Sequence, residues 1–335
     1  MPSKFFDKFV PFSQRQDVWG DVQPLKQYDT ETGAAPICPV AYSPDYEEAA
    51  GYFRAILASN ELSLRALDLT VDILKFNPGD YDAWALRRKI IDHLNLPLTQ
   101  ELEFLNEIGT YLEKNFQIWH HRRCIMELHQ QDFQQEKEFL EEIFYSDKKN
   151  YHAWSYKLWF IERFQLWDED EWRFIDEELD DEVTNNSLWS YRYFLVNKTN
   201  AALSQEIIES EIKYALNKLE LDYSNEATWV YLRGYLANSV EEAEKSQNSN
   251  AKRWIITDFP FLQEYMQGLL NSSTDKNMHI SNRFIYSVQL DFAIAENKWE
   301  EAVKILELLK KIDRMRENFY QWRINQINEK LQKQN

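Results

Sequence analysis

Apolar residues recur at spacings of three and four positions in several stretches of the chain. This spacing gathers the apolar side chains on one face of a helix. We therefore expect amphipathic helices around three series of residues: Leu64, Leu67, Val71 and Leu74; Leu102, Leu105, Ile108 and Leu112; and Trp172, Ile175, Leu179 and Val183.

Recurring tryptophans predict a second helix in each repeat. Four of them lie 35 residues apart, a fifth follows after 40, and each has Asn or Asp four positions before it. Asn and Asp favour the N-cap because their side-chain oxygen accepts a hydrogen bond from an otherwise unpaired backbone N–H. We expect a helix to begin at each such cap: Asp80 before Trp84, Asn115 before Trp119, Asn150 before Trp154, Asn185 before Trp189, Asn225 before Trp229 and Asn318 before Trp322.

Short stretches rich in turn formers separate the two helices of a repeat, as in FNPGDY (76–81) and YSDKKNY (145–151). A period of about 35 residues made of helix, turn and helix is typical of an α-solenoid, in which neighbouring repeats bury each other's apolar faces. The predicted fold class is therefore all-α, an α-α superhelix of helical hairpins.

The distribution of proline predicts where the helical part begins. Six of the 9 prolines fall within the first 44 residues. We therefore expect an irregular N-terminal arm at 1–44 and a helical-repeat solenoid at 45–335. Within the solenoid, residues 239–253 are polar and predict a loop that interrupts the repeats.

The charge balance excludes some classes of partner. With 38 basic and 56 acidic residues the formal net charge is −18, which would repel nucleic acid and anionic lipid. The acidic runs DEDE (168–171) and ELDDEV (178–183) lack the spacing of a magnesium-diphosphate site, so we interpret them as solvated helix faces.

Several features favour a cytoplasmic protein. The start of the arm lacks the continuous apolar core of a secretory signal, and no stretch is long and apolar enough to predict a membrane span. Cys38 and Cys124 have no CxxC spacing, so we expect no disulfide framework.

Motifs of complete active sites are missing from the sequence, including the phosphate loop, GxGxxG, GxSxG and HExxH. His120 and His121 are adjacent, so they point about 100° apart on a helix and do not hold one metal together. We expect structural histidines there and no metal site in this chain.

Two consecutive caps are preceded by lysine, at Lys114 and Lys149. A cation beside the positive end of a helix is mildly unfavourable. One interpretation is that both lysines simply extend into water. The other is that two helix N-termini and two ammonium groups converge on one anion, for which a diphosphate is suited.

Aromatic and polar residues alternate beside these lysines. Phe116 and Gln117 follow the first cap, and Tyr151 and His152 follow the second. They are suited to line an apolar channel with a few hydrogen-bonding groups. The alternative is that the two rings pack inside the repeats, since Tyr81 occupies the same position in an earlier repeat.

The sequence resembles a known family, the α subunit shared by protein farnesyltransferase and protein geranylgeranyltransferase type I. The resemblance lies mostly within residues 40–240. It rests on these segments: YFRAIL (52–57), NPGDYDAWALRR (77–88), KNFQIWHHRR (114–123), KNYHAW (149–154), NNSLWSYRYFLV (185–196) and, more weakly, ENFYQWR (317–323).

This resemblance implies a crescent of helical hairpins around a catalytic β subunit, a separate chain that holds zinc and most of the isoprenoid pocket. The implied heterodimer transfers farnesyl or geranylgeranyl from its diphosphate to the Cys of a C-terminal CaaX sequence. Zinc on the β subunit lowers the pKa of the thiol, and the resemblance leaves room for magnesium in the complex.

The resemblance also implies roles for single residues. Lys114 matches the lysine that reaches the diphosphate, and Gln117 matches the glutamine that binds the CaaX carboxylate. Asn150, Tyr151 and His152 match residues near the lipid diphosphate, and Lys149 adjoins them. The family often has Tyr where this chain has Phe116, which leaves the role of that position open.

Two alternatives remain at this point. The α subunit of the Rab geranylgeranyltransferase shares the repeat, although KNFQIWHHRR argues against it. A tetratricopeptide-like scaffold would bind peptides without catalysis, but its helix contacts rely on small residues rather than on an Asn-to-Trp block.

Overall fold

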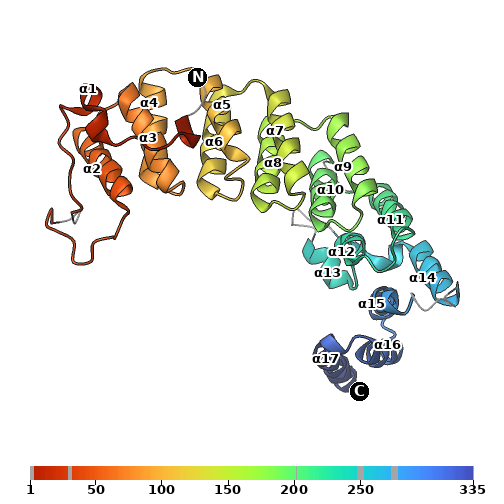
Figure 1. The fold of residues 1–335 in the computed structure, drawn as a ribbon. Helices are drawn as coiled ribbons and strands as arrows, with labels where there is room; N and C mark the ends of the chain where they lie inside the picture. The colour runs from red at the N-terminus through yellow and green to blue at the C-terminus, as the bar shows by residue number, and fades with distance from the viewer. Residues whose placement is uncertain (1–3, 29–31, 201, 247–252, 273–277, 335) are drawn as a thin grey trace. The chain divides into compact units, whose positions relative to one another are not determined.

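The computed structural model describes residues 4–28, 32–200, 202–246, 253–272 and 278–334. It is built almost entirely of helices arranged as hairpins, which confirms the predicted fold class (Figure 1). The chain divides into two compact units, Met1–Phe160 and Ile161–Asn335. No helix of the described residues is long and apolar enough to cross a membrane.

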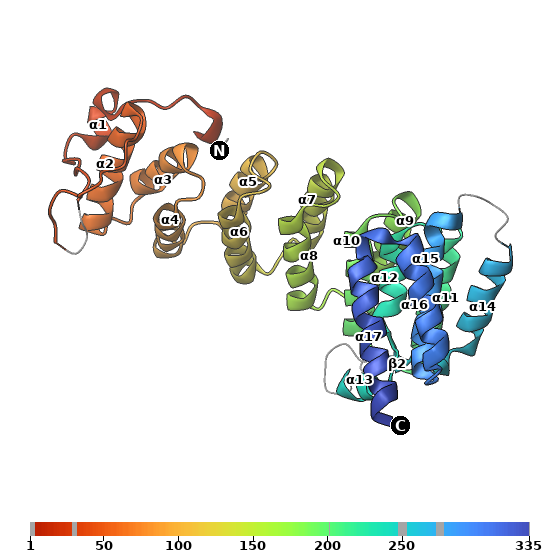
Figure 2. The same ribbon diagram turned by 90° about the horizontal axis from the view of Figure 1, so that it is seen from below.

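The first unit contains the arm and the first hairpins. Its longer helices lie side by side in Figure 2, and the last one, α8, ends just beyond the unit boundary. Their bounds are α2 (Pro44–Ser59), α3 (Leu64–Phe76), α4 (Tyr81–His93), α5 (Leu98–Gly109), α6 (Phe116–His129), α7 (Phe133–Ser146) and α8 (Tyr151–Phe164).

Five of the six predicted caps are confirmed. In each, the side-chain oxygen accepts a hydrogen bond from a backbone N–H of the first helical turn; the five are Asp80, Asn115, Asn150, Asn185 and Asn225. The prediction is wrong for Asn318, which lies inside the first turn of α17 (Glu317–Gln334). That helix starts earlier because the short 3₁₀ helix η4 (Arg314–Arg316) leads directly into it.

The spacing from cap to tryptophan has a structural cause. Each indole N–H donates to the backbone carbonyl six residues earlier, in the turn before the cap. The carbonyl of Glu113 accepts from Trp119 at 2.7 Å and also from the side-chain amide of Asn150 at 3.3 Å. Asn150 therefore caps its own helix and holds the turn of the preceding repeat.

Buried ion pairs also join consecutive repeats. Arg87 binds Glu101 through two hydrogen bonds of 2.6 and 2.7 Å, and Arg122 binds Glu136 in the same way. These pairs were not predicted from the sequence, although both members recur 35 residues later. Removing one partner of a buried pair costs about 3–5 kcal/mol, so the pairs bind the repeats together.

The N-terminal arm packs on the first hairpin. It contains η1 (Lys4–Phe6), η2 (Phe12–Gln14) and α1 (Gln16–Trp19). Phe12 is fully buried and stacks on Tyr52 with the ring centroids 4.1 Å apart, and Trp19 is 2% exposed. The arm therefore covers apolar surface that the first repeat would otherwise expose, as terminal repeats of solenoids require.

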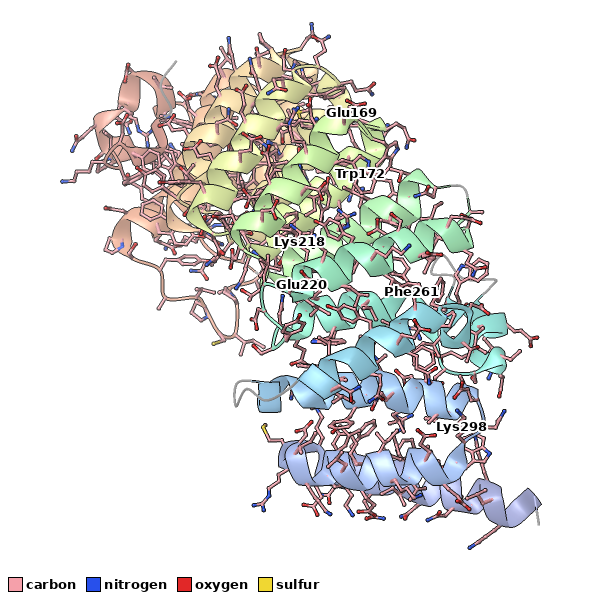
Figure 3. All side chains as sticks on the ribbon, turned by 90° about the vertical axis from the view of Figure 1, so that its right-hand side faces the viewer. Glu169, Trp172, Lys218, Glu220, Phe261 and Lys298 are labelled. Atoms are coloured by element: carbon pink, nitrogen blue, oxygen red, sulfur yellow. The ribbon has the colours of Figure 1, made fainter. Side chains whose placement is uncertain are left out.

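The second unit continues the hairpins and ends in three helices with their own apolar core (Figure 2). Lys298 marks the turn before α16 in Figure 3. The bounds are α9 (Glu169–Asp181), α10 (Asn186–Thr199), α11 (Gln205–Leu219), α12 (Glu226–Gly234), α13 (Val240–Ser246), α14 (Pro260–Ser272), α15 (Met278–Ala295), α16 (Trp299–Ile312) and α17, with η3 (Ile256–Asp258) before α14.

Two predictions about polar segments need correction. Residues 239–253 contain the helix α13, which lies between two short strands, β1 (Leu236–Ala237) and β2 (Trp254–Ile255), paired in parallel. Residues 247–252 lie outside the described residues. The acidic run 168–171 is not entirely a solvated face, because Glu171 is 2% exposed and accepts a hydrogen bond from the Tyr191 hydroxyl at 2.6 Å.

Candidate functional site

Lys114 lies in the turn before α6 and reaches toward the next repeat. Its ammonium nitrogen is 3.1 Å from Asp147 Oδ2, and the lysine side chain remains 71% exposed. The hydrogen bond to Asp147 raises the pKa of Lys114. Lys114 therefore pairs with a carboxylate of the next repeat, while most of its side chain faces solvent.

Asp147 also ties this lysine to the start of α8. Its Oδ1 atom accepts the backbone N–H of Lys149 at 3.0 Å. Two hydrogen bonds lower the pKa of Asp147: the one from the Lys149 backbone has the larger effect, and the one from the Lys114 side chain has the smaller effect. A carboxylate is thus held where the predicted anion site would lie, beside Lys114 and just before the second helix.

Gln117 points into the repeat from the first turn of α6. The residue is 5% exposed, and its backbone N–H donates to Asn115 Oδ1 at 2.9 Å. Its side-chain amide makes no hydrogen bond to any residue that the structure describes.

Asn150, at the cap of α8, is buried within the chain. It is 2% exposed; its amide oxygen accepts from the backbone of His152 and Ala153, and its amide nitrogen donates to Glu113. Both ends of the amide are therefore engaged within the chain. We expect Asn150 to shape the site by holding its two loops.

An open groove of about 180 Å³ runs between α6 and α8. The rings of Phe116 and His152 meet across it with centroids 6.5 Å apart. Phe116 is 62% exposed and Tyr151 is 77% exposed, so neither ring packs inside the repeats as the alternative interpretation required. Tyr81, at the same position of an earlier repeat, is also exposed, at 70%, so it does not support internal packing either.

The two adjacent histidines have separate environments. His121 is fully buried and its Nε2 lies 2.7 Å from Glu101 Oε1, so it belongs to the ion-pair network between repeats. His120 lines the groove, where burial and the neighbouring Arg88 and Arg123 lower its pKa. The described residues contain no cluster of three groups that could hold a metal ion.

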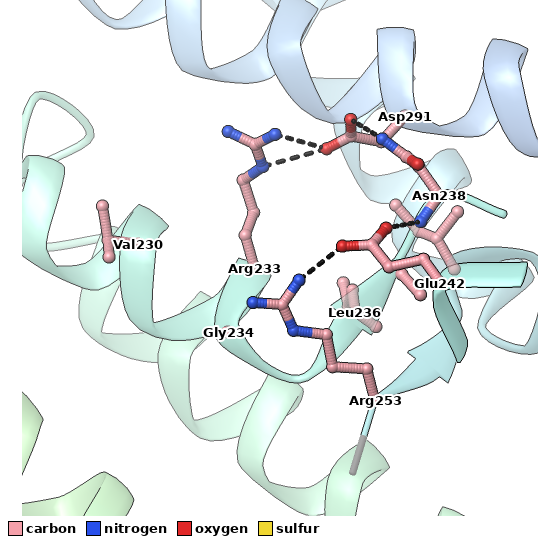
Figure 4. A pocket seen from close by; sticks show the side chains of 10 residues that line it. Val230, Arg233, Gly234, Leu236, Asn238, Glu242, Arg253 and Asp291 are labelled. Carbon is pink, nitrogen blue, oxygen red and sulfur yellow. Dashed lines mark hydrogen bonds and ion pairs between the residues drawn. The ribbon is translucent and has the colours of Figure 1, made fainter. Parts of the chain in front are cut away.

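A pocket of about 290 Å³ in the second unit contains two arginines (Figure 4). Arg233 contacts Asp291 at 2.7 Å, and Arg253 contacts Glu242 at 2.5 Å. Asn238 lies between the two pairs and donates to Asp291. The charges of this pocket thus satisfy one another, and it contains no free nucleophile or base.

The candidate site lies within repeats of a known family. The family model "Protein prenyltransferase alpha subunit repeat" matches residues 63–94, 98–129 and 133–164. The second and third matches include Lys114, Gln117 and the first turn of α8.

Curated relatives carry the name "Protein farnesyltransferase/geranylgeranyltransferase type-1 subunit alpha". The Arabidopsis thaliana protein is 46% identical over 104 residues, which is 31% of this chain and 31% of the relative. The Solanum lycopersicum protein is 42% identical over 100 residues, 30% of this chain and 28% of the relative. The aligned segment thus spans about a third of either relative.

The fold is similar over a far longer stretch. A chain of the solved structure of "Candida albicans protein geranylgeranyltransferase-I complexed with GGPP" is 29% identical and superposes with a TM-score of 0.74. The match covers 92% of this chain and 98% of that chain. Residues 63–164 therefore match protein prenyltransferase α-subunit repeats, and the fold of the chain is similar to that of the geranylgeranyltransferase-I chain.

Proposed function

We propose that this chain is the α subunit of a heterodimeric CaaX protein prenyltransferase. The partner is a catalytic β subunit, and the reaction transfers farnesyl or geranylgeranyl from its diphosphate to the Cys of a C-terminal CaaX sequence. The observation that carries the proposal is the pairing of Lys114, two residues before Phe116 of the aromatic groove, with Asp147 of the next repeat. The structural similarity to a geranylgeranyltransferase-I complexed with GGPP supports it.

Lys114 acts on the leaving group. The substrate sulfur attacks C1 of the isoprenoid, the C1–O bond breaks, and the diphosphate departs with its negative charge. An ammonium held at that position binds the departing diphosphate more strongly in the transition state than in the ground state. Asp147 holds Lys114 there in the free chain, and the diphosphate replaces the carboxylate as its partner.

The other residues of the site bind and orient the CaaX peptide and the lipid diphosphate. The amide of Gln117 donates to the carboxylate at the end of the CaaX peptide. Phe116, Tyr151 and His152 contribute apolar and aromatic surface beside the lipid diphosphate. Asn150 keeps the turns before α6 and α8 together.

We propose that zinc belongs to the partner subunit and not to this chain. We leave room for magnesium as a further metal of the complex. No role assigned to this chain depends on either metal. We further propose a cytoplasmic location, as for a soluble heterodimer.

Co-expression with candidate β subunits tests the proposal. The expected result is a stable complex that prenylates a CaaX peptide with one of the two lipids, while the chain alone is inactive. A complex that prenylates only Rab proteins would support the Rab geranylgeranyltransferase α subunit instead. If no complex binds an isoprenoid diphosphate, a tetratricopeptide-like scaffold becomes the better explanation.

A further inference from the structure

A second large pocket lies in the C-terminal helices, within the second unit. It is formed by one face of α17, the turn between α15 and α16 that Lys298 marks in Figure 3, and the residues just before α13. Its volume is about 720 Å³. Pockets that bind small organic ligands typically enclose roughly 300–1,000 Å³, so its size suits such a ligand.

The lining of this pocket is unusual for so acidic a chain. It includes two indole rings, Trp299 and Trp322, and two cations, Arg323 and Lys330. No acidic residue lines the described wall of this pocket, although the chain has 56 acidic and only 38 basic residues. The pocket therefore combines flat apolar surface with local positive charge.

Arg323 makes no direct ion pair within the part of the chain that the structure describes, and the carboxylates of Asp291 and Glu242 act on it only from a longer distance. Its guanidinium makes no hydrogen bond or ion pair there, and its aromatic neighbour is Phe319, whose ring centroid is 6.0 Å away. Burial lowers the pKa of Arg323, which Asp291 partly offsets. The neighbouring pocket differs, because there Arg233 and Arg253 are both paired with carboxylates (Figure 4).

Lys330 lies two turns after Arg323 on the same face of α17, about 10 Å along the helix axis. Its ammonium is 5.5 Å from the centre of the Trp299 ring. Glu241, the carboxylate whose pKa it helps to lower, is already paired with Lys245 at 2.7 Å. Gln326 lies between the two cations and adds a neutral hydrogen-bonding group.

We infer that this pocket binds an organic anion with an aromatic or other flat apolar body, whose charged group pairs with Arg323. Trp322, which is 55% exposed, covers one side of the apolar body, and Lys330 supports the negative charge. This inference is independent of the proposed prenyltransferase function, since no residue of the groove between α6 and α8 takes part.

Fluorescence titration of the full chain tests the inference, with the same preparation and any stabilising partner used for every variant. The probe is anilinonaphthalene sulfonate, and its uncharged parent phenylnaphthylamine reports binding without the anion. We expect one saturable sulfonate site that Arg323→Gln weakens at least about tenfold, as expected for a lost hydrogen bond between charged groups. Arg323→Lys should retain most of the affinity.

Arg314→Gln is the matched control, because it removes one positive charge from an exposed residue of η4 that is not in the pocket wall. It should change the affinity less than about twofold, and phenylnaphthylamine should bind all variants equally. Circular dichroism verifies that Arg323→Gln is folded. The inference is overturned if the parent and folded Arg323→Gln bind the sulfonate with equal affinity. It is also overturned if Arg323→Gln lowers the affinity for phenylnaphthylamine as much as the affinity for the sulfonate. If Arg323→Gln does not fold, unchanged affinity in Lys330→Gln overturns it.

Discussion

The ammonium of Lys114 lies 3.1 Å from Oδ2 of Asp147, a residue of the following repeat. The other oxygen of Asp147 accepts the backbone N–H of Lys149 at 3.0 Å. One carboxylate therefore links the two Lys-Asn caps. It gives the otherwise unfavourable cation at the start of α6 a partner of opposite charge, and we propose that the diphosphate replaces this partner in the working complex.

Replacing Lys114 with Ala should slow the chemical step of prenyl transfer by roughly 10- to 100-fold, because the departing diphosphate loses a charged hydrogen bond. The measurement is the single-turnover rate in the complex. In this variant the affinity for the CaaX peptide and the assembly of the heterodimer should change little. Gln117→Ala, by contrast, should mainly lower the affinity for the CaaX peptide. Lys304→Ala, which removes an exposed lysine of α16, is the control. A rate within about threefold of the parent would refute the role of Lys114.

Replacing Asp147 with Asn should tighten binding of the isoprenoid diphosphate by a few-fold, most clearly at low salt. The amide oxygen still accepts the Lys149 N–H, but the charge that competes for Lys114 is gone. The measurement is the dissociation constant of the complex for the lipid diphosphate. The gain should disappear when Lys114 is Ala; an equal gain in both backgrounds would mean that Asp147 acts without Lys114.

Asn150→Asp should lower the free energy of unfolding by about 1–3 kcal/mol, because aspartate keeps the cap but cannot donate to the Glu113 carbonyl. Asn115→Asp is the matched control, since the Asn115 amide nitrogen has no hydrogen-bond partner among the described residues. That change should stay within about 0.5 kcal/mol. Denaturant unfolding measures both, and equal losses would show that the link between repeats contributes nothing.

Acidification should destabilise the first unit in two stages. Burial lowers the pKa of His121, so the unfolded chain takes up a proton before the folded one, and stability falls as pH drops below about 6.5. Burial alone would raise the pKa of Glu101, but Arg87 and His121 lower it to about 2. The Glu101 contribution is therefore present above its ordinary pKa and is lost only as pH falls toward about 2.

The first stage is tested by unfolding midpoints between about pH 7 and about pH 5 for the parent and for His121→Gln. The glutamine can still donate to Glu101 but does not titrate. The unfolding midpoint of His121→Gln should therefore vary less with pH than that of the parent. An unchanged slope would assign the acid sensitivity to other groups.

Phe12→Ala should cost about 3–5 kcal/mol, the usual range for removing a fully buried phenylalanine. The Phe12 ring of the arm stacks on Tyr52. Removing the ring leaves a cavity that closes only if the arm moves. Phe6→Ala is the control in the same arm, because Phe6 is 49% exposed. Urea unfolding followed by circular dichroism should show a much smaller loss for Phe6→Ala. A loss for Phe12→Ala as small as that for Phe6→Ala would mean that the packing of the arm contributes little.

The sequence by itself determined the helices, the repeat and most of the caps. An N-cap bond joins atoms two or three residues apart, and the indole bond spans six, so both depend on local spacing that every repeat preserves. Exceptions arose where local signals competed. Asn318 has the right spacing, but the turn η4 starts its helix earlier, and the polar segment after residue 239 forms α13.

Only the tertiary structure decided which distant residues meet. Lys114 and Asp147 are 33 positions apart, and nothing in their own segments indicates that they form a pair. The same holds for Phe12 against Tyr52, for the buried Glu171 in an acidic run, and for the second hydrogen bond of Asn150. These contacts depend on how one hairpin packs against the next. That packing is set by the combined shapes of both apolar faces, which a pattern along one segment does not contain.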